Sequence, residues 1–357
     1  MFRENIIAEL KDKIARNPQD VENYKNLANY YIGCEDLNNA LIIYKEVLKL
    51  VPDDIQSLIN IGSICYYRKM YAEAIEYYKK VITLDKENFA PYYNLGNVYA
   101  EIENFELALS NYEEALKINP EKAEVYSAIG YLFQDVGNLE EAKSYYKKAN
   151  KLDCVNYENY INIANIEQKM GNIEEAVINY QRATELNPND TKALLCLANA
   201  YSSLKEYKCA HDCFKKVLQI DSSYYSAWVC HAITYCDEGN NQEAIELLKH
   251  AIEIDPNKSN AYILLANILV DEKRFEEALS IYKTVSQIVP DNPKILTFIA
   301  NVCVLMDNYT QAVKYYKKAI KQAPKDNEIK LIYIEMANSY INEKLKGLKW
   351  KVQSKIE

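Results

Sequence analysis

Apolar and polar residues recur along this chain with a period of 34 residues, which runs from Val21 to Asp326 without an insertion or deletion. Each period is numbered from its first residue, so that Val21 is position 1. Residues at positions 4, 7, 8 and 11 lie on one face of a helix, and those at positions 20, 24 and 27 on one face of a second helix. The pattern therefore predicts two helices per period.

Small residues recur at two of these positions. Position 8 is alanine or glycine in every period, whereas position 24 is Tyr, Phe or Leu. Because a large side chain on one helix needs a small one opposite it, this arrangement lets the helices pack closely. Position 20 is alanine in all nine periods, namely Ala40, Ala74, Ala108, Ala142, Ala176, Ala210, Ala244, Ala278 and Ala312.

Turn residues separate the two predicted helices, as in Gly137-Asn138 and Gly171-Asn172. Glycine and asparagine accept the left-handed conformation that ends a helix. Proline recurs at position 32, as in Pro120 and Pro188, where it stops the second helix because it has no backbone N–H to donate.

This 34-residue pattern resembles the tetratricopeptide repeat (TPR) family. The resemblance implies an all-α fold, a right-handed TPR superhelix (α-solenoid) of helix-turn-helix hairpins, in which the first helices line a concave inner groove. The period at 89–122 carries the pattern most fully, with Tyr92, Leu95, Gly96, Tyr99, Ala108, Tyr112, Ala115 and Pro120.

The periods divide the chain into three parts. Residues 1–20 are predicted to form an N-terminal half-repeat helix, residues 21–326 nine 34-residue TPR repeats, and residues 327–357 a C-terminal capping helix or helices with a solvating basic tail that includes Trp350. After Pro324 we expect the period to slip by three residues. The residues that then fit a tenth first helix are Tyr333, Met336, Ala337, Asn338 and Tyr340.

Asparagines repeat on the face expected to line the groove, mainly at positions 9 and 6. Helix propensity does not explain them, because asparagine is a mediocre helix former. The side-chain amide offers donors and an acceptor to the backbone of an extended peptide, or else it bridges neighbouring repeats. The pattern is similar to the asparagine ladder of the O-linked N-acetylglucosamine transferase family, whose catalytic domain this sequence does not contain. The candidates are Asn26, Asn29, Asn60, Asn94, Asn97, Asn162, Asn165, Asn199, Asn267 and Asn301.

Chaperone-binding members of the family give a second, partial resemblance. They hold a C-terminal carboxylate with a lysine and asparagines, which Lys25, Asn29 and Asn60 match. Ala90 and Asn94 stand where those members have two basic residues. A single lysine provides few of the charge-assisted hydrogen bonds that such a clamp uses, so we expect the clamp to be incomplete.

Apolar residues lie at or next to groove-facing positions in the last three repeats. They predict either a seat for a partner's amphipathic helix or half-buried contacts between adjacent first helices. In the fifth repeat, Glu167 takes position 11, where an aromatic or apolar residue is usual. We expect its carboxylate to reach the groove, or to select a basic residue of a partner. The apolar candidates are Val229, Ile233, Ile263, Leu264, Val270, Phe298 and Val304.

Cysteine and histidine cluster in the sixth and seventh repeats, but without the converging ligands that a zinc site needs. Cys209 and Cys213 share one helix face, His211 points away from them, and His231 takes a core position. We therefore predict packing roles and no metal. Phosphate-binding loops, HExxH motifs and nucleophile elbows are lacking, so we predict no catalytic residue and no cofactor.

Composition narrows the class of protein further. A net charge of −9 argues against a general nucleic-acid binder. The sequence has no apolar run of the roughly 18 residues that a membrane span needs, and Met1–Leu10 does not read as a signal peptide. Nine cysteines without a disulfide-framework spacing fit the reducing cytoplasm.

The sequence thus predicts a cytoplasmic, non-catalytic scaffold or adaptor that binds a peptide or helix of a partner protein in its concave groove. Two alternatives remain. One is a targeting subunit of a multi-subunit enzyme, such as a glycosyltransferase or a secretion or assembly complex. The other is a structural protein that forms homo-oligomers through its ends.

Overall fold

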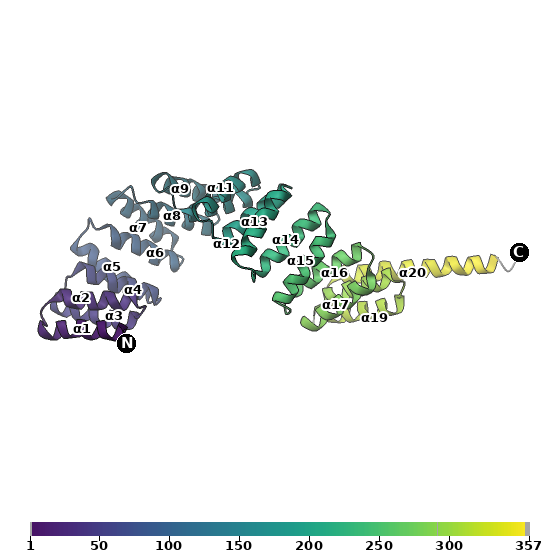
Figure 1. Cartoon of the computed structure of the whole chain (residues 1–357), viewed down its shortest axis with the longest axis horizontal. Helices are drawn as coiled ribbons and strands as arrows, with labels where there is room; N and C mark the ends of the chain where they lie inside the picture. Colours follow the sequence, from purple (N-terminus) through teal and green to yellow (C-terminus); the bar gives the residue numbers. More distant parts are fainter. Residues whose placement is uncertain (1, 291, 354–357) are drawn as a thin grey trace. The chain divides into compact units, whose positions relative to one another are not determined.

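The structure of the protein is a computed structural model, and it describes residues 2–290 and 292–353, leaving aside the side chains of residues 2, 339 and 342–353. All regular structure in these residues is α-helical. The chain divides into two units, Met1–Met170 with helices α1–α10 and Gly171–Glu357 with helices α11–α20 (Figure 1). Within each unit, consecutive helices pack against one another. The predicted all-α array of helix pairs is confirmed.

The first helix of each repeat begins at position 1. In six of the nine repeats, the Asp or Asn just before it accepts a hydrogen bond from a backbone N–H of the first turn. Asp190, for example, accepts from the N–H groups of Lys192 and Ala193. These helices are α2 Val21–Gly33, α4 Ile55–Tyr67, α6 Phe89–Glu101, α8 Ala123–Asp135, α10 Tyr157–Lys169, α12 Thr191–Ser203, α14 Tyr225–Glu238, α16 Ser259–Asp271 and α18 Pro293–Leu305.

The second helix of each repeat runs from position 17 to position 30. Its position-20 alanine is fully buried in all nine repeats, as the helix-packing argument requires. These helices are α3 Leu37–Leu50, α5 Tyr71–Leu84, α7 Phe105–Ile118, α9 Leu139–Leu152, α11 Ile173–Leu186, α13 Tyr207–Ile220, α15 Asn241–Ile254, α17 Phe275–Ile288 and α19 Tyr309–Gln322.

The turn between the two helices places position 15 in the left-handed region in all nine repeats. Three of these residues are glycine, such as Gly239 with φ of 89°. The left-handed conformation costs an L residue about 1–2 kcal/mol, so the other six turns are strained. The six residues are Glu35, Lys69, Glu103, Lys205, Lys273 and Asp307.

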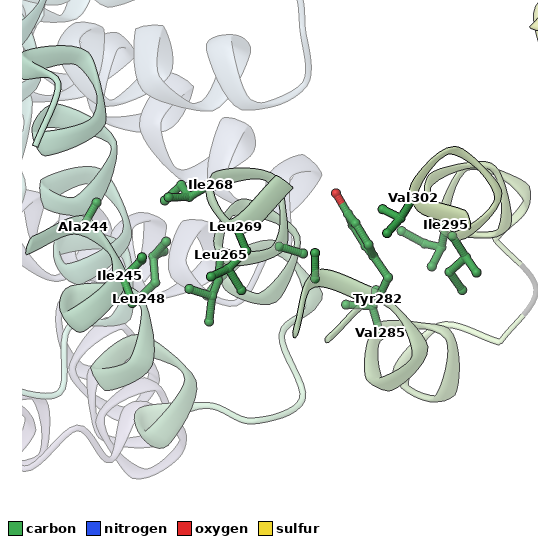
Figure 2. Packing of buried hydrophobic residues seen from close by; sticks show 14 of the residues in the cluster. Ala244, Ile245, Leu248, Leu265, Ile268, Leu269, Tyr282, Val285, Ile295 and Val302 are labelled. Atoms are coloured by element: carbon green, nitrogen blue, oxygen red, sulfur yellow. The ribbon is translucent and has the colours of Figure 1, made fainter. Parts of the chain in front are cut away.

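Apolar side chains of successive helices form a continuous core from α14 to α20 in unit 2. Figure 2 shows Leu248 of α15 beside Leu265 of α16, and Tyr282 of α17 beside Val302 of α18. In unit 1, a Cβ atom built on Gly62 would lie 2.6 Å from Cε1 of Tyr78, so only glycine lets that ring pack where it does. Large side chains thus meet small ones between helices of the same unit, as predicted.

The ends of the chain are helices without a partner in the same repeat. α1 (Phe2–Arg16) packs Leu10 and Ile14 against the core of unit 1. α20 (Asn327–Gln353) is a single long helix. The part of the predicted basic tail that carries Trp350 lies outside the described side chains.

The predicted slip of three residues after Pro324 is wrong. α20 begins at Asn327, and α18 begins 34 residues earlier at Pro293. Ile329 and Met336, at positions 3 and 10 of the unshifted period, are buried. The period continues in phase because Asp326 caps α20 through the N–H groups of Glu328 and Ile329, as Asp and Asn cap earlier first helices.

Candidate functional site

Four asparagines at position 9 are bonded to the tyrosine at position 24 of the same repeat, and this tyrosine lies on the second helix. In each case the tyrosine hydroxyl donates to the asparagine side-chain oxygen, across 15 residues of sequence. The pairs are Tyr44–Asn29 at 2.5 Å, Tyr112–Asn97 at 2.7 Å, Tyr316–Asn301 at 2.5 Å, and Tyr282–Asn267.

These hydrogen bonds fix the orientation of each amide. The side-chain oxygen faces the tyrosine, so the NH₂ group at the other end of the amide points to a second partner, which for Asn97 is the Tyr93 hydroxyl. Burial raises the pKa of Tyr282 and of Tyr316 to about 12, so both hydroxyls keep their protons at neutral pH. Asn267 is itself exposed. At Asn267, the first-helix face therefore presents an amide donor to solvent.

Position 6 links neighbouring repeats within each unit. Asn60 Nδ2 donates to the Tyr44 hydroxyl of the preceding repeat at 2.6 Å. In unit 2, the Tyr180 hydroxyl bonds to the thiol of Cys196, which stands at the same position. Asn60 and Cys196 thus bridge neighbouring repeats, which is one of the two roles predicted for the asparagines. Among the other candidates, Asn199 bonds to the Cys230 thiol, Asn26 is exposed, and Asn94, Asn162 and Asn165 are half-buried.

Lys25 is held by a carboxylate of the protein itself. Its Nζ lies 2.6 Å from Oδ1 of Asp54, and the two side chains are 21% and 15% exposed. Asp54 also accepts from the backbone N–H of Ser57 at 2.9 Å. Although burial raises the pKa of Asp54, the bonds from Lys25 and Ser57 outweigh it and lower that pKa. A ligand carboxylate would have to compete with Asp54 for Lys25.

A cleft in unit 2 brings the predicted asparagines and apolar residues together. Its volume is about 390 Å³, and first helices α16 and α18 form most of its wall. Asn267 and Asn301 lie beside the apolar side chains of Val270 and Phe298, and Asp271 adds a carboxylate. The full lining is Asn267, Val270, Asp271, Tyr282, Phe298, Asn301, Val302 and Leu305.

The other apolar candidates contribute mainly to packing. Val229 is buried, and Ile263, Leu264 and Val304 are half-buried against the core of unit 2. Ile233 is 39% exposed. Val270 and Phe298 combine contact with this core and a place in the cleft.

Glu167 does not reach the groove, so that prediction is wrong. Its side chain is buried, and Oε1 lies 3.6 Å from Nζ of Lys143 on the preceding helix α9. A buried carboxylate is stable only beside a compensating charge, which Lys143 supplies. Among the causes that act on Lys143, burial opposes its charge but the two glutamates beside it, Glu140 and Glu167, prevail and raise its pKa.

Two histidines from different repeats, His211 and His231, lie in contact. His231 Nε2 is 3.0 Å from His211 Nδ1, and His211 Nε2 is 3.0 Å from a carboxylate oxygen of Glu238. Since that carboxylate accepts, His211 donates through Nε2. Burial first, then His211 and Lys215, lower the pKa of His231 to about 4, so it is neutral at pH 7.

The cysteines near these histidines are free thiols, with Cys209 exposed and Cys213 buried. Within the described ranges, no group of three His, Cys, Asp or Glu side chains is placed to hold a metal ion. Nor does any described helix have the length and apolar character to cross a membrane.

Tandem helix pairs, joined by buried alanines and bearing a polar first-helix face, define an α-solenoid repeat protein. Tetratricopeptide-repeat family models match residues 90–122, 123–153, 235–302 and 269–333, and a TPR-repeat model matches residues 62–102 and 164–205. The chain belongs to the tetratricopeptide repeat superfamily. Repeats of this superfamily generally serve as protein-interaction modules.

Several solved structures are similar in fold. A tetratricopeptide repeat protein from Parabacteroides merdae is 19% identical, with a TM-score of 0.52 over 70% of this chain and 98% of that one. YrrB, described as a TPR protein with an unusual peptide-binding site, is 28% identical, with a TM-score of 0.47 over 52% of this chain and 95% of that one. A MamA protein is 24% identical, with a TM-score of 0.45 over 48% and 93%. No curated protein matches the chain.

Proposed function

We propose that the protein is a non-catalytic scaffold whose first-helix groove binds an extended peptide of a partner protein. The observation that supports it is the cleft between α16 and α18, where oriented amides adjoin apolar side chains. A peptide backbone offers carbonyl oxygens at regular intervals, and these accept hydrogen bonds from NH₂ groups.

The cleft also matches the other needs of a peptide. Asp271 provides an acceptor for a peptide N–H, and Val270 and Phe298 provide apolar contact for one side chain. Hydrogen bonds to the backbone carry little sequence information, so the apolar contact supplies the selectivity. We place the protein in the cytoplasm, with a protein or peptide as its partner and no nucleic acid.

The test uses a peptide selected against the wild-type protein from a random display library. Affinity is measured by fluorescence anisotropy for wild type and for Asn267→Asp/Asn301→Asp. Aspartate keeps the oxygen that accepts from Tyr282 or Tyr316 but removes the NH₂ donors. Losing two hydrogen bonds of about 1 kcal/mol each weakens binding roughly 30-fold.

A matched control separates groove amides from surface amides in general. Asn179 lies on the second helix α11, where its Nδ2 bonds to the carbonyl of Glu175. Asn179→Asp should leave affinity unchanged. Equal affinity of wild type and Asn267→Asp/Asn301→Asp would refute the proposed role of the amides.

A further inference from the structure

A second cavity lies away from the first-helix groove and shares no residue with the cleft described above. Its volume is about 670 Å³, within the range of small-molecule sites. Second helices α13 and α15 form its two walls, and α14 contributes Trp228, His231 and Tyr235. The remaining lining is Lys215, Leu218, Gln219 and Ser222 on one side and Gln242, Glu243, Glu246, Leu247 and His250 on the other.

Four side chains with aromatic rings line this cavity, namely Trp228, His231, Tyr235 and His250. The Trp228 ring lies 5.1 Å from the His250 ring, and the Tyr235 ring stacks 5.0 Å from the His231 ring. Position 7, where His231 stands, is leucine or isoleucine in the other eight repeats. The imidazole of His231 thus adds an aromatic ring where the other repeats have an aliphatic side chain. The faces of aromatic rings carry a negative potential that attracts cations.

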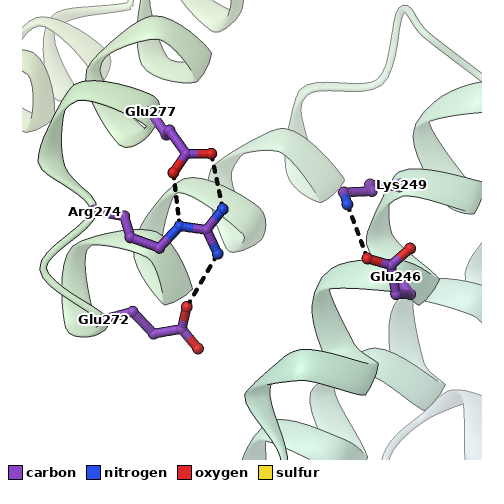
Figure 3. A network of polar contacts seen from close by, with 5 residues as sticks. All are labelled: Glu246, Lys249, Glu272, Arg274 and Glu277. Carbon is purple, nitrogen blue, oxygen red and sulfur yellow. Dashed lines mark hydrogen bonds and ion pairs between the residues drawn. The ribbon is translucent and has the colours of Figure 1, made fainter.

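Carboxylates line the α15 wall. Glu243 and Glu246 both line the cavity. Lys249, which is not part of the lining, forms an ion pair with Glu246, with 2.8 Å between Nζ and Oε1 (Figure 3). The α13 wall carries one cation, Lys215. His231 adds no positive charge at pH 7, because its pKa is about 4. Lys249 offsets the charge of Glu246, whereas Glu243 has no ion-pair partner among the described residues, so its carboxylate is the one available to a cation.

We propose that this pocket binds an organic cation with an aromatic or apolar body. The body lies on Trp228 and between Leu218 and Leu247, and the cationic group meets the carboxylate of Glu243 or Glu246. An organic anion of the same shape meets two carboxylates and a single lysine, so it binds less well. The carboxylate of a zwitterion would pair with Lys215. A substitution of this lysine therefore distinguishes a zwitterion site from a cation site.

Three probes of one shape test the proposal: phenethylamine is a cation, phenylalanine a zwitterion and 3-phenylpropionate an anion. Ligand-observed NMR with the full chain measures their dissociation constants. We expect phenethylamine to bind with a dissociation constant of about 1 mM or below, which is reasonable for so small a ligand. Phenylpropionate should bind at least about 10-fold more weakly, with phenylalanine between them.

Variants locate the site and assign the charges. Trp228→Leu should abolish phenethylamine binding, and leucine already occupies position 4 in Leu58, Leu194 and Leu296, so the fold tolerates it. Glu243→Gln/Glu246→Gln should weaken phenethylamine at least about 10-fold. The control Lys215→Gln should leave its affinity unchanged or raise it. Helicity from circular dichroism confirms that each variant folds.

Several outcomes overturn the proposal. Binding of none of the probes, or equal binding of all three, removes the cation site. Stronger binding of phenylalanine, with loss of affinity in Lys215→Gln, assigns the pocket to a zwitterion instead. Phenethylamine binding that survives Trp228→Leu places the probe elsewhere on the protein.

Discussion

His231→Leu is expected to make unit 2 less sensitive to acid. Leucine or isoleucine stands at position 7 of the other eight repeats, so the helix packing accommodates the new side chain. The variant removes a buried imidazole whose pKa is about 4 in the folded protein, compared with an ordinary value of 6.5. In the unfolded chain the imidazole is solvated and takes that ordinary value.

The size of the effect follows from this difference in pKa. Between pH 6.5 and pH 4, His231 binds a proton in the unfolded chain but stays mainly neutral in the folded protein. The free energy of unfolding therefore falls as the pH falls through this window. Relative to pH 7, the loss of unfolding free energy is about 2 kcal/mol at pH 5 and about 3 kcal/mol at pH 4. Above pH 7 the residue is neutral in both states and contributes no pH dependence.

Urea unfolding at pH 7, 5 and 4 measures this loss for wild type and His231→Leu. Both proteins carry Trp350→Phe, so that Trp228, in the same helix as His231, is the sole tryptophan and reports the local unfolding step. A local probe is needed because repeat arrays can unfold in parts. The difference between the two proteins should shift by about 2 kcal/mol from pH 7 to pH 5.

A control variant tests whether the effect belongs to His231 alone. Leu265 stands at position 7 of the next repeat, is buried and carries no titratable group, so Leu265→Ile should keep the pH dependence of wild type. Parallel stability profiles of wild type and His231→Leu would refute the reasoning, since a solvated imidazole has no such effect.

Three further predictions concern buried side chains and backbone strain. Ala142→Leu should lower the unfolding free energy by ~1–3 kcal/mol, because Ala142 is fully buried, and a wild-type melting curve would contradict the assigned register. Lys205→Gly should raise stability by up to about 1 kcal/mol because φ is 62° at this residue, whereas Lys205→Ala should not; equal urea midpoints for the two would exclude strain. Glu167→Leu should destabilise unit 1 because the largely buried Lys143 then keeps only the exposed Glu140 as a charged partner, and adding Lys143→Leu should restore stability; additive effects in thermal melts would contradict the buried ion pair.

The fold was predictable because the residue pattern of one structural unit recurs nine times in the sequence. A single buried alanine says little, but alanine at position 20 in every repeat leaves few ways to pack the helices. The left-handed turn was predictable from Gly137 and Gly171, and it then holds for Glu103 and Lys205, whose own conformational preferences oppose it. The common geometry of the hairpin overrides local preference at those residues.

The candidate site was less predictable, because its geometry depends on partners in other helices. The sequence places Asn267 on the first-helix face, but it does not show that Tyr282 occupies the amide oxygen. In the same way, Lys25 resembles a ligand-binding lysine until Asp54 is found 2.6 Å away. Periodicity assigns a residue to a face, whereas hydrogen bonding decides what that residue can offer a ligand.

Two pairs of polar residues each cross a junction between neighbouring repeats, and they limit how the repeats can be ordered. Lys143 and His211 both stand at position 21, where the other repeats have Leu, Ile or Val, and they contact Glu167 and His231 in the following repeat. A repeat docked on the wrong neighbour would bury Glu167 away from Lys143, or His231 away from His211, which is costly. We infer that the pairs oppose mispairing between similar repeats. Lys143→Leu/Glu167→Leu should therefore yield more domain-swapped dimer after refolding than wild type, measured by size-exclusion chromatography, and an equal yield would count against this role.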